Sequence, residues 1–204
     1  MQQIIQRSLS EEVLDKTMNL FWEKGYFNTT VDDITAATGF NRAALYKYYG
    51  GKDQLFLKML ERFRNNITNQ VTLPLQDKTN GIEGIKTFFS QFLDLYITKD
   101  IRSRGCFLVS TAADIHSHNK DVADFIDGFY RDVTQLFRDS LLYAKDEGML
   151  KAEIEIDSVA NFLVGNLFGL MTLCRSSAPK QIFENHVSGI INYLLDISTT
   201  RLSK

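Results

Sequence analysis

Residues 41–52 contain three cations and no acid, although the chain as a whole carries almost balanced charge. The cations are Arg42, Lys47 and Lys52, and two tyrosines, Tyr46 and Tyr48, stand among them. Ammonium, guanidinium and hydroxyl groups hydrogen-bond to phosphate oxygens, and an arginine can also read the edge of a guanine. The residue types and their spacing therefore indicate a small surface that contacts nucleic acid.

A short helix over residues 31–38 is expected just before this surface. Thr30 can cap it, and Asp33 can return a hydrogen bond to the cap, as in a capping box. Gly39 stands where the helix must stop, because glycine tolerates the left-handed conformation that ends many helices.

A second short helix, residues 42–48, is expected to carry the cations and tyrosines. Asn41 is a suitable N-cap for it, and Gly50 and Gly51 end it. Two short helices joined by a tight turn form the helix-turn-helix, which places its second helix in the major groove of DNA.

A longer helix over residues 8–24 precedes these two and completes an N-terminal three-helix bundle. The apolar residues expected to form its core are Leu20, Phe21, Phe27, Val31, Ile34, Ala37, Phe40, Leu45 and Tyr49.

The net charge of −2 over 204 residues gives no global nucleic-acid signal. Residues 1–60 also balance, with seven Lys and Arg against seven Asp and Glu. Phosphate neutralisation supplies much of the affinity for DNA, so one copy of this chain should bind weakly.

The sequence favours a cytoplasmic protein with no membrane partner. The first residues are polar and lack the apolar stretch of a signal peptide. The most apolar run, 159–174, is short for a membrane span and contains Asn161 and Asn166, so a buried helix is expected there. Two cysteines, Cys106 and Cys174, make no disulfide framework.

The rest of the chain has helical periodicity, which predicts an all-α fold of about nine helices without strands. We expect a helix from Lys52 to about Thr72, a loop at 75–81, and a helix from Ile82. The following helices are expected at 105–116, from an Asn119 cap to Gly148, from an Asp157 cap to about Arg175, and from Pro179 to about Ile197. The predicted domains are residues 1–51, for DNA binding, and 52–204, a helical bundle for ligand binding and dimerisation.

Residues 8–60 resemble the tetracycline-repressor-like (TetR/AcrR) family of bacterial transcriptional regulators. The matching residues form a long composite motif with fixed spacing: Gly25-Tyr26-Phe27, Thr29-Thr30-Val31, Ile34, Thr38 to Tyr49, and Lys52-Asp53-Gln54-Leu55. The likeness beyond residue 60 lies in the order and number of helices and in the segment 105–109. The resemblance implies DNA contacts from Thr30, Asn41, Arg42, Ala44, Tyr46, Lys47, Tyr48 and Lys52.

The resemblance also implies an apolar ligand pocket in the second half, whose occupation moves the two recognition helices of a dimer apart. Large aromatic side chains are abundant there, and a bundle this rich in them can enclose a cavity. The residues chosen as its lining are Phe88, Phe92, Phe107, Phe129 and Phe168. The function implied is that of a repressor that a small apolar effector, of unknown identity, releases from a palindromic double-stranded DNA operator.

The last two long helices are expected to form a homodimer interface, as in the family. Gly165 and Gly169 would let another helix approach closely, and a helix pair this apolar is expected to be hard to bury within one small chain. The residues expected in the interface are Leu163, Leu167, Leu170, Val187, Ile190, Ile191 and Leu194.

Other chemistry finds little support in the sequence. His116 and His118 are two positions apart, which does not place them on one helix face, so surface or cap roles are favoured over metal binding. Cys106 follows Arg102 and Arg104, which leaves redox sensing open beside a structural role. We expect no metal, no cofactor and no enzyme activity, because no catalytic triad, carboxylate pair or phosphate-binding glycine motif is present.

The alternative to a regulator is an all-α adaptor or binding protein whose helix-turn-helix has lost DNA binding. The balanced charge of residues 1–60 favours it, and the acid-free span 41–52 opposes it.

Overall fold

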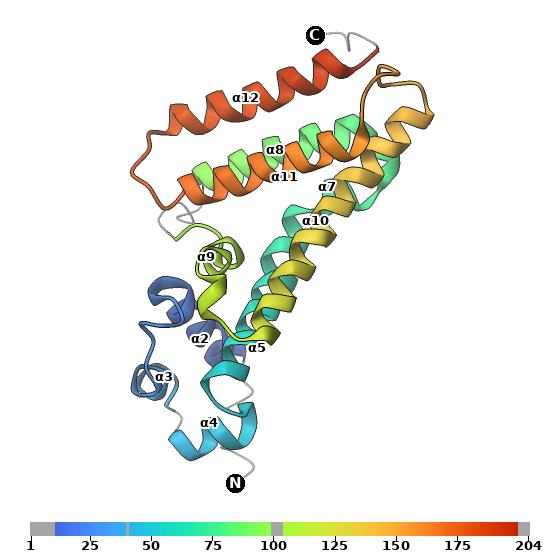
Figure 1. Ribbon diagram of the computed structural model, residues 1–204. Helices are drawn as coiled ribbons and strands as arrows, with labels where there is room; N and C mark the ends of the chain where they lie inside the picture. Colours follow the sequence, from blue (N-terminus) through green and yellow to red (C-terminus); the bar gives the residue numbers. More distant parts are fainter. Residues whose placement is uncertain (1–10, 40, 99–103, 200–204) are drawn as a thin grey trace.

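The computed structural model describes residues 11–39, 41–98 and 104–199. Among these residues, all regular structure is helical, apart from an isolated antiparallel bridge between Leu150 and Ser198. The molecule is elongated, with α3 and α4 at one end and α8, α11 and α12 at the other (Figure 1). This agrees with the predicted all-α fold.

The N-terminal unit consists of α2 (Glu11–Lys24), α3 (Val31–Thr38), α4 (Arg42–Tyr49) and α5 (Lys52–Phe63). Its core includes Phe21, Ile34 and Leu45, which have no exposed surface. The ring of Phe21 on α2 meets the ring of Phe56 on α5 at 5.1 Å between centroids. Helix α5 therefore completes the packing of the first three helices, although the predicted domain boundary places it in the second half.

Two residues predicted in this core are exposed instead. Phe27 is 52% exposed and Ala37 is on the surface. Buried threonines occupy part of the interior: the hydroxyl of Thr38 donates to the carbonyl of Ile34 at 2.6 Å, and that of Thr17 donates to Val13 at 2.8 Å. These internal hydrogen bonds let a polar residue fill a core position. Phe40 lies outside the described residues.

The helix predicted from Lys52 to about Thr72 is confirmed as a continuous helical stretch, and only the segment after it is more regular than predicted. A π-helical segment, Arg64–Thr68, and a short α6, Asn69–Val71, continue α5. The expected loop at 75–81 is mostly helical, with α7 (Leu73–Gln76) and a 3₁₀ turn (Lys78–Asn80). Pro74 lies in the first turn of α7, where proline has no helical hydrogen bond to lose.

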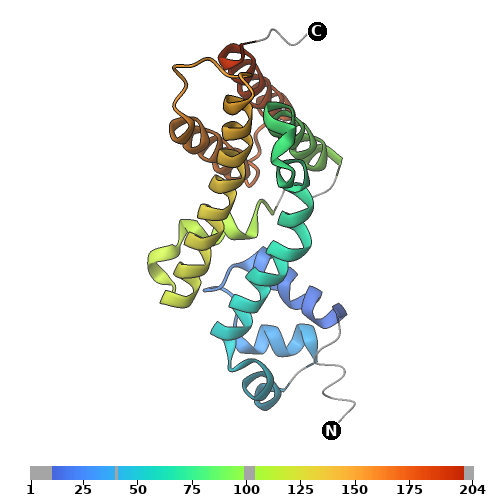
Figure 2. The ribbon, with the colours of Figure 1, turned by 90° about the vertical axis from the view of Figure 1, so that its right-hand side faces the viewer.

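The bundle contains α8 (Gly81–Thr98), α9 (Phe107–Ala113), a 3₁₀ turn (Ile115–Ser117), α10 (Lys120–Asp146), α11 (Ile156–Leu173) and α12 (Lys180–Ile197). Helix α10 runs from the α8, α11 and α12 layer toward the N-terminal unit, and Figure 2 shows the same arrangement from the side.

The helix ends of the bundle confirm two of three predicted caps. Asn119 accepts from the backbone N–H of Val122 at 3.1 Å, and Pro179 directly precedes α12. The predicted Asp157 cap is wrong, because α11 begins one residue earlier and Asp157 pairs with Arg138 at 2.7 Å instead.

By length and composition alone, α11 could cross a membrane. In the bundle, however, its residues Val159, Leu163, Leu167 and Leu170 are at most 4% exposed, which is the packing of a core helix.

Candidate nucleic-acid interface and ligand cavity

The second helix of the helix-turn-helix is held at both ends by local hydrogen bonds. Asn41 caps α4, with its Oδ1 accepting from the backbone N–H of Ala44 at 2.8 Å. Thr30 and Asp33 form the predicted capping box at the start of α3. Gly39 ends α3 with φ of 73°, a left-handed value that other residues rarely adopt. The turn between the two helices is therefore fixed by residues that the sequence identifies.

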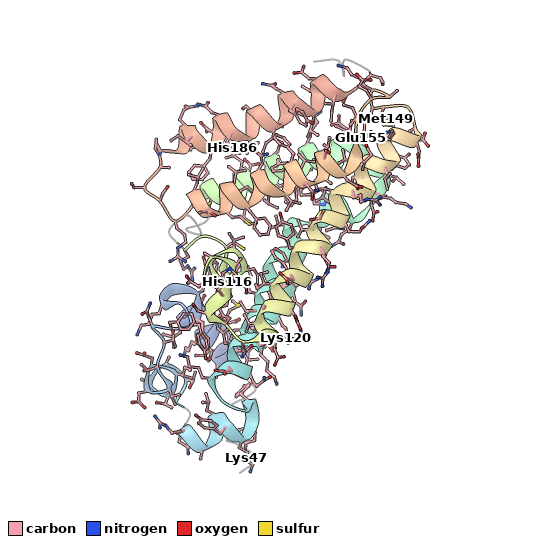
Figure 3. All side chains as sticks on the ribbon, in the orientation of Figure 1. Lys47, His116, Lys120, Met149, Glu155 and His186 are labelled. Carbon is pink, nitrogen blue, oxygen red and sulfur yellow. The ribbon has the colours of Figure 1, made fainter. Side chains whose placement is uncertain are left out.

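Helix α4 displays Arg42, Tyr46 and Lys47 on its outer face. The side chain of Tyr46 is 56% exposed, and Lys47 lies at the far end of the molecule, away from the bundle (Figure 3). Arg42 meets Asp32 of α3 at 3.5 Å, but both side chains are highly exposed, so this ion pair is weak. The guanidinium can exchange Asp32 for a phosphate or a base at little cost.

Three of the predicted DNA-contact residues are constrained by their own fold. Ala44 is 8% exposed and points into the core, so its methyl group is not available for the DNA contact that the resemblance implies. The Oδ1 of Asn41 is engaged in the cap. The hydroxyl of Thr30 accepts from the N–H of Asp33 at 3.0 Å and donates to its carboxylate at 2.8 Å. The side chains of Asn41 and Thr30 thus hold the ends of α4 and α3 in place, and their oxygens are already engaged within the chain.

Two further predicted residues, Tyr48 and Lys52, are half-buried at the edge of this surface. Lys47 places its ammonium 5.5 Å from the ring centre of Tyr48. Lys52 begins α5 and places its ammonium 4.1 Å from the ring centre of Tyr26, and burial lowers its pKa. The hydroxyl of Tyr26 donates to Asp53, and burial together with this bond raises the pKa of Tyr26 to about 12. Lys52 is thereby held beside α4 rather than free in solvent.

An apolar cavity, in which the centre of a water molecule can range over about 50 Å³, lies between the N-terminal unit and the bundle. Among the described residues, no charged side chain belongs to its lining, which is formed by Trp22, Phe63, Val71, Thr72, Phe88, Phe92, Leu95, Gly105, Cys106, Phe129, Val133, Leu167 and Met171.

Three of the five predicted lining residues, Phe88, Phe92 and Phe129, border this cavity. Phe107 does not, because its ring packs against Phe56 and Phe63 of α5 at 5.5 and 5.8 Å. Phe168 does not border it either, because its ring packs against the rings of Phe129 and Tyr130, with centroids 6.0 and 5.0 Å apart.

The prediction missed the wall that the N-terminal unit contributes. Trp22 and Phe63 reach the cavity from α2 and α5, with ring centroids 4.9 Å apart. A sequence signal for Trp22 existed, because it stands four residues after Met18 and extends the apolar stripe of α2. The helical period alone does not tell which cavity that stripe faces.

Cys106 forms part of the cavity wall, at the start of α9. Burial raises the pKa of its thiol to about 11, so it is protonated at neutral pH and weakly nucleophilic. Cys174 is also buried and free, and its thiol donates to the carbonyl of Leu170 at 2.8 Å. The guanidinium of Arg104 lies over the ring of Trp22, and burial dominates the pKa of Cys106.

The three histidines have separate surroundings. His116 is exposed near the junction of the two units (Figure 3). His118 is half-buried among aromatic rings, and His186 meets Oδ1 of Asn166 at 2.8 Å. Within the described part of the chain, no group of three or more His, Cys, Asp or Glu could hold a metal ion.

The residues predicted for a dimer interface are mostly core residues of the single chain. Leu163, Leu167, Leu170, Val187, Ile190 and Leu194 are at most 3% exposed, and Ile191 is half-buried. The expectation that one chain could not bury this helix pair was wrong, because α8 and α10 cover its inner face.

The outer face of α11 and α12 carries other residues. Phe162 and Ile182 are 44% and 43% exposed. A methyl group added at Gly165, Gly169 or Gly189 would meet nothing within 4 Å. The outer side of both helices is therefore open at these glycines.

Comparison with known proteins gives a consistent result over nearly the whole chain. Residues 13–59 match the bacterial regulatory proteins of the tetR family, and residues 81–187 match the tetracyclin repressor-like C-terminal domain. The first match ends within α5, the helix that packs on both halves.

Individual relatives support the same assignment. The HTH-type transcriptional regulator YezE of Bacillus subtilis is 25% identical, over 89% of this chain and 94% of its own. The HTH-type transcriptional repressor ComR of Escherichia coli is 23% identical, over 84% of this chain and 81% of its own.

Among solved structures, the TetR family regulator CifR, a cysteine mutant in complex with a 26-bp double-strand operator DNA, has the same fold. Its TM-score is 0.75 at 21% identity, over 90% of this chain and 95% of that one. With one family domain matched over α2–α5 and the other over more than half of the chain, the protein belongs to the tetR family of bacterial regulatory proteins and is a helix-turn-helix transcriptional regulator.

Proposed function

We propose that the protein is a dimeric cytoplasmic repressor that binds a pseudo-palindromic operator through two α4 helices and leaves it when an apolar effector fills the cavity. The observation that carries this proposal is the exposed face of α4. Arg42, Tyr46 and Lys47 lie on a capped helix at the end of the molecule. These three side chains are exposed, so the packing of the chain alone does not account for them.

Each group has a distinct role on DNA. Lys47 and Lys52 neutralise phosphates, and the hydroxyl of Tyr46 donates to a phosphate oxygen. Arg42, at the N-terminus of α4, is the base reader, because guanidinium donors match the O6 and N7 acceptors of guanine. With so few cations per chain, specific affinity requires two copies bound together.

The outer face of α11 and α12 supplies the means of pairing. Exposed Phe162 and Ile182 provide apolar surface, and the open glycines Gly165, Gly169 and Gly189 let a second pair of helices approach closely. Paired chains would hold two α4 helices about 34–36 Å apart, one turn of DNA. This face replaces the inner-face leucines of the sequence prediction.

The cavity determines the class of effector. Its lining offers aromatic faces, aliphatic side chains and few polar groups, which suits a small uncharged molecule. An effector that binds more tightly to the conformation with separated α4 helices shifts the population away from the DNA-binding state.

A footprinting experiment on the DNA that flanks the protein's own coding sequence tests this function. We expect two protected half-sites related by a two-fold axis and spaced by about one helical turn. Absence of any protected site in that region, at low salt and with folded protein, would contradict the proposal.

A further inference from the structure

Trp22 lies on α2 of the N-terminal unit, and its side chain lines the proposed effector cavity. Its indole is 4% exposed and forms part of the cavity lining. Accepting the proposed function, we infer that Trp22 is a direct effector-contact residue that couples the cavity to the DNA-binding unit. An effector that fills the cavity then touches α2 itself, and needs no relay through the bundle.

The indole is attached to the bundle by a long-range hydrogen bond. Its Nε1–H donates to the carbonyl of Gly105 at 3.0 Å, across 83 positions of sequence. The guanidinium of Arg104 lies 4.4 Å from the indole ring centre and donates to Asn19 of α2 at 2.9 Å. Helix α2 is therefore bonded to residues 104–105, which lead into α9, and Gly105 also borders the cavity.

The backbone at Gly105 is held tightly from the other side. Its φ is 66°, and an added Cβ would lie 2.7 Å from Cγ of Arg175 and 3.3 Å from the carbonyl oxygen of Met171. The carbonyl that accepts from Trp22 thus has little freedom to follow a moving indole. Displacement of the indole must therefore break or bend the Trp22–Gly105 hydrogen bond, so the state of this bond depends on whether the cavity is filled.

Space exists for such a displacement. A second pocket, polar in character, in which the centre of a water molecule can range over about 140 Å³, lies on the junction side and includes Tyr26, Phe27 and His118. Trp22 is the residue common to this pocket and the apolar cavity among the described lining residues. An indole pushed out of the cavity would enter the contact between the N-terminal unit and the bundle.

The aromatic wall also narrows the class of effector. The indole meets Phe63 edge to face at 4.9 Å, and Phe88, Phe92 and Phe129 line the same space. Flat apolar molecules fit between aromatic faces and edges, because offset and edge-to-face ring pairs are favourable. The inferred effectors are therefore small, uncharged and aromatic.

Contact with Trp22 can be measured directly, because it is the only tryptophan in the chain. We would titrate the purified full-length protein with bromobenzene, whose heavy atom quenches indole emission on contact, and with toluene as a matched non-quenching probe. We expect saturable quenching by bromobenzene that toluene reverses by competition. A saturable rise in melting temperature with bromobenzene, but without quenching, would overturn the inference.

The coupling is tested by the ratio of DNA dissociation constants with and without saturating bromobenzene. This ratio cancels any change that a variant makes in DNA affinity itself. Allosteric couplings typically amount to about 5- to 150-fold, and we expect such a ratio for the wild type. In Trp22→Phe, which keeps a ring but loses the N–H donor, it should fall toward one, whereas Phe92→Leu should weaken probe binding and keep the ratio at saturation.

Two results would overturn the coupling: a wild-type ratio of one, or a Trp22→Phe ratio equal to that of the wild type. Failure of the proposed function gives a different pattern. In that case the wild type binds no DNA from its own locus, while the quenching experiment still reports whether a cavity ligand touches Trp22.

Discussion

The imidazole of His118 stacks on the ring of Phe56, with centroids 5.3 Å apart and planes within 1° of parallel. His118 lies just before α10, and Phe56 is a core residue of α5. The rings of Tyr26 and Phe27 lie 5.2 and 5.0 Å from the same imidazole. The imidazole of His118 therefore packs at the junction, which we call the joint, between the DNA-binding unit and the bundle.

The joint should be sensitive to pH. Burial lowers the pKa of His118 from its ordinary 6.5, against the opposing effect of Asp114 and Asp53. The unfolded chain thus binds this proton at higher pH than the folded chain does. The contribution of uncharged His118 to the free energy of unfolding is therefore fully present above pH 6.5, and it is lost as the pH falls through the lowered pKa of the folded state. Urea midpoints measured between about pH 8 and pH 5 should show this loss.

His118→Phe keeps an aromatic ring on Phe56 and removes the titrating group. We expect it to reduce the loss of stability at low pH, whereas His116→Gln, at an exposed histidine two positions away, should leave the profile unchanged. Parallel pH profiles for His118→Phe and the wild type would refute this role.

Single substitutions on α4 should separate charge from base reading. Lys47→Ala should weaken binding to all DNA sequences alike and reduce the salt slope by about 1, because it removes one phosphate contact. Arg42→Ala should cost about 1–3 kcal/mol on the operator and relax the preference at one base pair. Lys151→Ala, at an exposed lysine between Met149 and Glu155 at the end of the molecule opposite Lys47, is the control (Figure 3). Equal losses from Arg42→Ala on operator and random DNA would remove Arg42 as a base reader.

The cap on the recognition helix should contribute measurably to stability. Asn41→Ala leaves the backbone N–H of Ala44 without its side-chain acceptor. We expect a loss of about 1 kcal/mol in the free energy of unfolding, and Asn41→Ser should retain most of it. Thermal or urea unfolding checks this, and an alanine variant as stable as the wild type would show that the cap is dispensable.

A bulky charge on the outer face of α11 should separate the two copies. Gly165→Arg meets open space within the chain, so the fold and its helix content should be retained. Light scattering should then give half the wild-type mass, and operator affinity should fall by roughly 10²- to 10⁴-fold as bivalent binding is lost. The matched control is Gln135→Arg, on the exposed side of α10. A Gly165→Arg variant that remains a dimer would place the interface elsewhere.

Features encoded by neighbouring residues were predictable from the sequence. The Thr30 capping box, the Gly39 stop and the Asn41 and Asn119 caps each depend on residues within four positions, so the sequence contains the whole interaction. The number and order of the long helices followed from their apolar periodicity in the same way.

Features that depend on packing between distant elements were not predictable from the sequence. Periodicity marks an apolar stripe but does not show what the stripe contacts. Leu163 was therefore assigned to a second chain, although α11 packs against α10 in its own. Ala44 lies on the inner side of a very short helix, where a rotation of one residue exchanges core and surface. Trp22 was missed because its cavity is built by helices far apart in the sequence.

The most direct test of the central claim is the dissociation constant for two duplexes of equal length, one from the protein's own locus and one with the same bases scrambled. Both should be measured by fluorescence anisotropy between roughly 50 and 200 mM salt. The account predicts at least roughly 10³-fold tighter binding to the native duplex, and steep weakening of both as salt rises. Equal affinity for the two duplexes, or binding that does not respond to salt, would contradict it.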